Sequence, residues 1–488
     1  MELAESPEVK EILRRYREVW AIDHALSLMS WDMETYMPEA GFRERGEARA
    51  VLRRMIQRIL TSQEFKSLVW RAEPQNDFEK GVIRVLKRKI ERYEKLPPEF
   101  IEEEAKATTA AYSVWVKAKE KSDYKLFSPH LSRVFDLAKR KAELLGYEKH
   151  PYDPLLDWFE EGLTVADCEK LFSITGELSE LFKKASEKYP QKHPLEEEKY
   201  SEQRMRELNM KVLKAMGFDF KRGRIDVSPH PFTSGIGLDD VRITTWYHGR
   251  DFRRSLFAAL HEFGHAAYDM NIDRALWLTP VQGGASLGVH ESQSLFWENI
   301  VGRSMAFVEA FQRDMVEHLP FLREYTAEDV YRYFTLVRPE LIRVEADEVQ
   351  YVLHVYLRYK IEKDMLEERL DVSELPQVWD ELMEKLIGVK PESHRDGVLQ
   401  DVHWSQGYIG YFPTYAIGRV LAAQVALLIK ELEEKVREKR FSEIMGFLRE
   451  KVHRWGAVYP PRELVKRALG EELTPPKLLE YLKLKYLS

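Results

Sequence analysis

Two histidines, a glutamate and a glycine interrupt an apolar stretch, SLFAALHEFGHAAYDM, at residues 255–270. Residues four apart share one face of an α-helix, so His261 and His265 can offer ring nitrogens to the same ion while Glu262 sits beside them. The structural alternative is a pair of buried, hydrogen-bonded histidines, but the adjacent glutamate would then bury a charge without a partner. A divalent cation supplies that partner. The H-E-x-x-H spacing therefore predicts a catalytic metal site.

A catalytic zinc takes three protein ligands and keeps one position open for water, so a third ligand must come from another segment. Asp269 continues the same stripe, but a rise of about 1.5 Å per residue places it roughly 12 Å from His261, too far to share one ion. Glu291, in LGVHESQSLFWENI, lies on the next helical pattern and is our predicted third ligand. Its neighbour His290 diverges by about 100°, and Glu298 is placed only to support a ligand.

A competing pattern overlaps this region, because GASLG at 284–288 matches the G-x-S-x-G turn of serine hydrolases, centred on Ser286. That turn needs an apolar parallel strand before it and an α/β sheet around it. Pro280 interrupts the preceding stretch, and the rest of the chain is helical. We instead expect a strand at Gly283–Val289, at a sheet edge that an extended peptide can approach.

The elements that must position these residues are mainly helices. Long amphipathic patterns begin at Phe42, Pro98 and Gly418 and run to residues 63, 121 and 439. The main exception is RIDVSPHPFTSGIGLDDVRITTWYHG at 224–249, which predicts one small antiparallel β-sheet. No repeat or compositional break marks a domain boundary, so residues 1–488 are expected to form a single domain, with two lobes as an equal alternative to two domains.

The composition of the chain argues against nucleic acid and membranes as partners and indicates a cellular compartment. The chain has 75 Lys+Arg against 82 Asp+Glu, so no strong field attracts nucleic acid or an anionic membrane. No apolar run reaches the about 18 residues that a bilayer span requires. With one cysteine, Cys168, and no signal-peptide pattern at its start, the chain is expected to be cytoplasmic. Abundant charge and only four asparagines are typical of thermostable proteins.

Several motifs together extend the argument beyond H-E-x-x-H. HEFGH at 261–265 and HESQS at 290–294 are accompanied by SWDMETYMP at 30–38, HPF at 230–232, DVRIT at 240–244, IRVEAD at 342–347 and GVLQDVHW at 397–404. These motifs are spread over nearly the whole chain. Together, and in their order along the sequence, they resemble the signatures of the carboxypeptidase Taq family of metallocarboxypeptidases.

The resemblance implies a two-lobed helical body around a deep groove, similar to neurolysin and thimet oligopeptidase, with N-terminal helices (about 1–100) covering the groove. It also implies a homodimer that removes single residues from peptide C-termini with broad specificity. One divalent metal per chain is expected, zinc or cobalt, since the two share these ligands. Glu262 would be the general base.

The same resemblance directs attention to further site residues. An oxyanion needs hydrogen-bond donors, and similarity to the related oligopeptidases favours His403 and Tyr415 within the Gly-rich segment 400–418. Tyr408 and Tyr411 in that segment, and His230, are candidate substrate contacts, with surface or turn packing as the alternative. Exopeptidase action needs a cation for the substrate carboxylate, and the candidates are Arg242 and Arg343.

Each of these arginines has a structural alternative, a buried ion pair with an acid such as Asp240 or Asp347. Trp31, Tyr36 and Trp404 are candidate groove walls, with core packing as the default. Besides a carboxypeptidase, three functions remain open: an oligopeptidase that cleaves internally, a serine hydrolase using Ser286, and a helical scaffold with a structural zinc.

Overall fold

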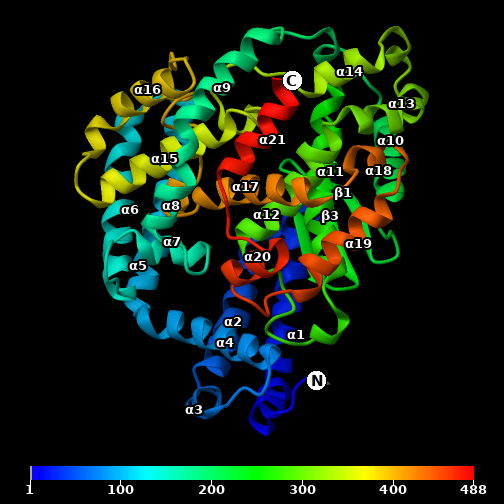
Figure 1. Ribbon diagram of the computed structural model, residues 1–488. Helices are drawn as coiled ribbons and strands as arrows, with labels where there is room; N and C mark the ends of the chain where they lie inside the picture. The colour runs from blue at the N-terminus through cyan, green and yellow to red at the C-terminus, as the bar shows by residue number, and fades with distance from the viewer. Residues whose placement is uncertain (1–2, 488) are drawn as a thin grey trace. The chain divides into compact units, whose positions relative to one another are not determined.

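The computed structural model describes residues 3–487, and helices dominate them, as predicted (Figure 1). The chain forms two compact units, each assembled from three stretches of sequence. The first unit comprises residues up to 93 together with 192–335 and 422–472; the second comprises 94–191, 336–421 and the chain from 473 onward. Among the described residues, no helix combines the length and the apolar character needed to span a bilayer.

The first unit holds the H-E-x-x-H helix, α11, and the helix that follows it, α12. Its helices are α1 (Pro7–Thr35), α2 (Phe42–Leu60), α3 (Gln63–Arg71), α4 (Asp77–Lys95), α10 (Glu202–Met216), α11 (Phe252–Asn271), α12 (Leu287–Leu295), α13 (Met305–His318), α14 (Ala327–Phe334), α18 (Leu432–Arg437), α19 (Phe441–Lys451) and α20 (Pro461–Leu469). A π-helical turn, η5 (Phe296–Gly302), continues α12.

The second unit carries the segment 400–418. Its helices are α5 (Pro98–Lys121), α6 (Tyr124–Leu145), α7 (Asp153–Phe159), α8 (Val165–Leu171), α9 (Thr175–Lys188), α15 (Tyr351–Leu366), α16 (Leu375–Leu386) and α21 (Pro476–Tyr486). Short 3-10 turns, η7 (Arg343–Glu345) and η9 (Trp404–Gln406), lie in its loops, and α17 (Pro413–Leu428) runs across a boundary between the units.

Two of the three long predicted helices are confirmed, as α2 and α5. The third prediction, from Gly418 to residue 439, is wrong in its second half, where α17 ends at Leu428 and α18 begins at Leu432. Glu431 between them has a φ of 55°, which an α-helix cannot contain. The break lets α18 turn onto α13 and bury Val436, a tertiary gain that helical periodicity does not reveal.

The predicted island of β-structure is a three-stranded sheet of β1 (Gly223–Val227), β2 (Thr233–Gly237) and β3 (Asp240–Thr245). The order is β1-β3-β2, and only the β2–β3 pair is antiparallel; β1 runs parallel to β3, with Arg224 opposite Arg242. The sheet is therefore mixed, which corrects the antiparallel prediction. The tight turn between β2 and β3 imposes antiparallel pairing on them, and β3 then lies between β1 and β2.

The expected strand at Gly283–Val289 is absent, and α12 begins at Leu287 instead. Ser286 is the N-cap of α12: its hydroxyl accepts a hydrogen bond from the Val289 amide at 3.1 Å. At Gly284, a Cβ would lie 2.7 Å from the His290 ring, so the small residue serves close packing here. Without a preceding strand, Ser286 also lacks the strand-turn-helix context of a serine-hydrolase nucleophile.

Candidate metal centre and active-site residues

The three predicted metal ligands lie together in the first unit. His261 and His265 are one turn apart on α11, and Glu291 reaches them from α12. Its Oε2 atom lies 3.7 Å from Nε2 of His261 and 3.5 Å from Nε2 of His265. One ligand atom from each residue lies within 4.8 Å of the others, a separation that one ion can bridge. Among the described residues this is the group of acids and histidines that could hold a metal.

Gly264 allows the two helices to approach closely enough for this geometry. A Cβ at this position would lie 2.4 Å from both the Gln293 carbonyl oxygen and the Ser294 Cα. Any side chain here would push α12, and with it Glu291, away from α11. A glycine in the middle of a helix is unfavourable by about 1 kcal/mol relative to alanine, which was the signal that could have predicted this contact.

Glu298 supports His261 from behind. Its Oε2 atom lies 2.9 Å from His261 Nδ1, and its Oε1 accepts a hydrogen bond from Arg303 at 2.9 Å. Burial favours the neutral acid, but the bonds from His261 and Arg303 lower the pKa of Glu298 to about 2. The carboxylate therefore stays ionised and directs Nε2 of His261 toward Glu291, the supporting position expected for Glu298.

His290 and Asp269 form a second chain of contacts behind His265. Nδ1 of His290 lies 2.8 Å from Nδ1 of His265, and Nε2 of His290 lies 3.1 Å from Asp269 Oδ1. The Nδ1 atom of each predicted histidine ligand is thus held by a neighbouring side chain, that of Glu298 for His261 and that of His290 for His265. This support, together with a set of two histidines and one carboxylate, fits a catalytic zinc-type ion.

Replacing Asp269 with asparagine is expected to weaken metal binding by about 10- to 100-fold, because His290 loses its anionic partner and no longer orients His265 firmly. Competition with a chelator of known affinity measures this change. Asp273→Asn is the control, since Asp273 lies beyond the end of α11 and binds the Ala275 amide. Equal metal affinity in both variants would remove Asp269 from the support of the centre.

Glu262 lies beside the ligands, is 6% exposed, and is fixed by the sheet. The hydroxyl of Thr233, on β2, is 2.6 Å from Glu262 Oε2 and 3.0 Å from the Glu262 carbonyl oxygen. A hydrogen bond to one carboxylate oxygen orients the group and leaves Oε1 to accept a proton. Thr233 was missed by the sequence analysis, because its link to Glu262 depends on the packing of β2 against α11.

The second unit gathers the other predicted site residues around His403. Its Nε2 lies 3.3 Å from the Tyr415 hydroxyl, and the Tyr411 ring centroid is 5.5 Å from the imidazole centroid. Tyr408 stacks on Tyr411 and is 43% exposed. Burial, assisted by nearby arginines, lowers the pKa of His403 to about 4, so the ring is neutral at pH 7.

Arg343 is 4% exposed and is paired with Asp401, not with Asp347. Arg358, which is fully buried, binds the other oxygen of Asp401. Two guanidinium groups thus share one carboxylate, and the Arg343 guanidinium lies 5.0 Å from the ring centre of Tyr415. Burial favours protonation of Asp401, but the arginines hold its pKa well below the usual value.

Arg242, in the first unit, forms the ion pair with Asp240 that the sequence analysis considered, with contacts of 2.7 and 2.8 Å. Its guanidinium also lies 4.3 Å from the ring centre of Trp31. Trp31 and Trp404 are buried, which agrees with core packing, the alternative to a role as groove walls. Tyr36 is exposed, and its hydroxyl donates a hydrogen bond to Asp226. His230 is exposed in the turn before β2, where its carbonyl accepts from Ser228.

A helical fold with a His-His-Glu cluster on adjacent helices and a fixed glutamate next to the first histidine is that of an H-E-x-x-H metallopeptidase. The chain belongs to the carboxypeptidase Taq (M32) metallopeptidase family, whose sequence profile matches residues 10–486. This confirms the family assignment made from the motifs.

The relatives match over nearly their full length. Thermostable carboxypeptidase 1 of Pyrococcus furiosus is 47% identical over 497 residues, covering 100% of both chains. Carboxypeptidase 1 of Bacillus subtilis is 36% identical, covering 98% of this chain and 97% of that one. A solved Pyrococcus furiosus carboxypeptidase structure, Apo-Mg, has 46% identity and a TM-score of 0.98, covering 99% of this chain and 100% of the other. The chain is therefore a metallocarboxypeptidase by family.

Proposed function

We propose that this metallocarboxypeptidase releases single C-terminal residues from peptides with broad specificity. The observation that carries the proposal is the approach of Glu291 to His261 and His265, with Glu262 fixed beside them by Thr233. The carboxypeptidase names of the relatives support the direction of attack. Internal cleavage of short peptides is the alternative, because the metal motif alone permits both.

The proposed metal is zinc, with cobalt as the other ion suited to these ligands. When bound, such an ion supplies Lewis-acid activation of water and of the scissile carbonyl. Glu262 accepts the proton of the attacking water at its carboxylate and passes it to the leaving amine. His403, which is neutral at pH 7, and Tyr415 are the proposed hydrogen-bond donors to the developing oxyanion.

Recognition of the substrate's terminal carboxylate is assigned to Arg343 or Arg242. The shared use of Asp401 by two arginines supports Arg343, since a carboxylate that also binds Arg358 balances only part of the Arg343 charge. Arg242 is supported by its position on β3, the strand that pairs with the strand carrying Thr233. Tyr408, Tyr411 and His230 remain proposed substrate contacts, and Tyr408 and His230 are exposed enough to serve.

A comparison of one peptide as its free acid and as its C-terminal amide tests the proposal. The amide loses a charge-assisted pair and leaves an arginine unpaired, a loss of roughly 2–5 kcal/mol, so its cleavage should be about 30-fold slower or more. Mass spectrometry should show the acid shortening by one residue at a time. Equal cleavage of both, or internal fragments as first products, would favour the oligopeptidase alternative.

The same assay identifies the arginine. Arg242→Ala and Arg343→Lys are compared, the second keeping the positive charge among buried partners. The variant that slows the acid strongly and the amide little has lost the carboxylate contact.

We further propose a homodimer in a cytoplasmic setting, thermostability like that named for the Pyrococcus furiosus relative, and a substrate groove covered by N-terminal helices of residues 1–100. These proposals rest on the family and on the composition of the chain. Light scattering measures the oligomeric state directly, and thermal unfolding measures the thermostability.

A further inference from the structure

Helix α15 in the second unit is buried on nearly all sides, and two of its charged residues, Arg358 and Glu362, are fully buried one turn apart. Residues four apart lie on the same face of a helix. Both side chains are fully buried and are directed at the segment 400–410, which contains His403. A charged pair in such a helix is unfavourable unless its partners are specific, so the partners show what the pair holds.

Arg358 holds the segment before His403. Its Nη2 donates to Gln400 Oε1 at 2.8 Å, and its Nε binds Asp401. The guanidinium also lies 4.6 Å from the ring centre of Trp379, which covers it. The chain entering His403 is therefore fixed by an arginine that solvent does not reach.

Glu362 holds the segment after His403 at two points. Its Oε1 accepts from the indole nitrogen of Trp404 at 2.7 Å, and its Oε2 accepts from the backbone amide of Gly410 at 2.9 Å. The hydroxyl of Tyr152 donates to the same Oε2. Two of these three donors, the indole and the backbone amide, cannot rotate their hydrogen away, so the carboxylate fixes both ends of the turn 404–410.

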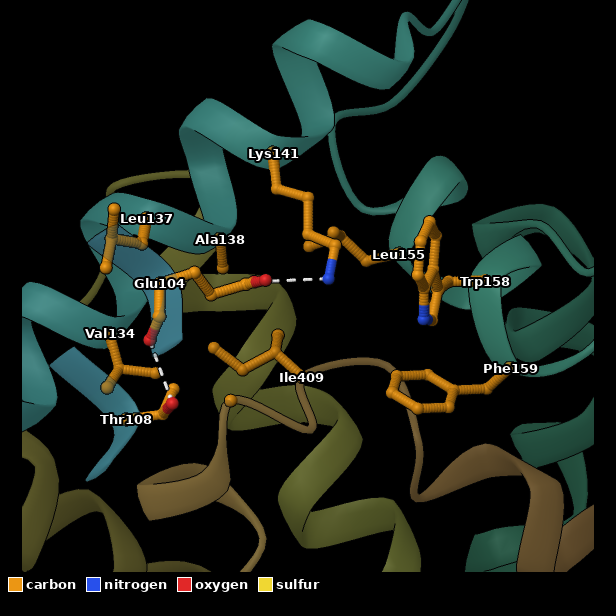
Figure 2. Close-up of a pocket in the computed structure, with 11 residues that line it drawn as sticks. Glu104, Thr108, Val134, Leu137, Ala138, Lys141, Leu155, Trp158, Phe159 and Ile409 are labelled. Atoms are coloured by element: carbon orange, nitrogen blue, oxygen red, sulfur yellow. Dashed lines mark hydrogen bonds and ion pairs between the residues drawn. The ribbon is translucent and has the colours of Figure 1, made fainter. Parts of the chain in front are cut away.

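The turn 404–410 is packed more tightly at its end than in its middle. Gly410 has a φ of 100°, and a Cβ there would lie 2.6 Å from the Leu155 carbonyl oxygen, so the end of the turn fits against α7 only as glycine. On the other side, a cavity between α5, α6 and α7 borders Gly407 and Ile409, and Figure 2 shows Ile409 next to it with Glu104 and Lys141. The turn therefore packs tightly at Gly410 and borders this cavity at Gly407 and Ile409, and the hydrogen bonds of Glu362 restrain both of its ends.

We propose that Glu362 is a positioning residue for catalysis, which fixes the turn 404–410 and through it the location of His403 and Tyr411. This inference rests on the proposed function of His403 as an oxyanion donor. Burial raises the pKa of Glu362 to about 7, against three hydrogen bonds that favour the carboxylate. Glu362 was not predictable from the sequence, because nothing in the local pattern links α15 to a segment about 40 residues away.

Glu362→Gln tests the proposal with almost no change of shape. The single carbonyl oxygen of glutamine can accept from Trp404 or from Gly410 but not from both, and its amide group then faces an N–H. We expect kcat to fall by about 10- to 100-fold with KM within about threefold, because a displacement near 1 Å of a group that stabilises the transition state acts on turnover. Hydrogen exchange of peptides covering 400–412 should become about tenfold faster.

Tyr152→Phe is the matched control. It removes the third hydrogen bond to the same carboxylate and leaves the two that fix the turn. This variant should keep kcat and the exchange rate of the turn close to those of the parent enzyme. If Glu362→Gln does not fold, Trp404→Phe replaces it: the ring remains, one fixed donor is lost, and kcat should fall about 3- to 10-fold with faster exchange.

Three outcomes would overturn the proposal: an unchanged kcat in Glu362→Gln, equal losses in Glu362→Gln and Tyr152→Phe, or a lower kcat without faster exchange in the turn. An inactive parent enzyme with full metal content would instead refute the proposed function. In that case the exchange rates alone decide whether Glu362 holds the turn, since they do not require turnover.

Discussion

Glu262→Gln is expected to retain the metal and to lower kcat by about 10²- to 10⁴-fold. Glutamine has nearly the same shape, and its carbonyl oxygen can still accept the Thr233 hydrogen bond, so α11 and the sheet should keep their packing. The amide group, however, cannot take a proton from water or return one to the leaving amine. Metal analysis and steady-state kinetics on one unblocked peptide measure both halves of this result.

Glu309→Gln provides the control for this variant, because Glu309 is a surface carboxylate paired with Arg437. It should match the parent enzyme in kcat and metal content. If Glu262→Gln lost the metal as well, Glu262 would be a ligand, and if it kept nearly normal turnover, another group would have to be the base.

The variants His265→Ala and Glu291→Ala should each lose both the metal and detectable turnover. The parent enzyme should contain about one ion per chain, and two remaining ligands hold such an ion much more weakly than three. Elemental analysis after dialysis measures the content. His318→Ala on α13, whose ring contacts the Asp314 carbonyl, should keep a full complement.

Full metal content and activity in both ligand variants would show that the ion is held elsewhere. Loss of activity with the metal retained would point to a role in substrate binding instead. Removing the ion from the parent enzyme with a chelator should abolish turnover reversibly, and adding zinc or cobalt back shows which ion restores it.

The clustering of the candidate ligands was predictable because helical geometry alone places His261 next to His265 and separates Asp269 from His261. Glu291 required one further assumption, that the next helix folds back on α11. The strand predicted at Gly283–Val289 was wrong because small residues suit both an edge strand and a close approach to a helix N-terminus. Local composition does not distinguish these contexts; the packing of Gly284 on His290 does.

The parts of the site that escaped prediction depend on contacts distant in sequence. Thr233 binds Glu262 through the packing of a sheet on a helix, and Asp401, rather than Asp347, is the partner of Arg343. Neither pairing leaves a periodic signal. A fully buried charge on a helix, such as Glu362 on α15, marks the existence of such a partner without identifying it.

The interleaving of the two units has a consequence for synthesis on the ribosome. Because the first unit needs residues as late as 472 and the second begins at 94, any single cut between those positions leaves both units divided. The usual order, in which an N-terminal domain folds before the next one emerges, is therefore not open to this chain. Helices α1–α4 must wait for partners made much later, whereas the three predicted metal ligands all come from the short stretch 261–291 and can meet as soon as α12 has been translated.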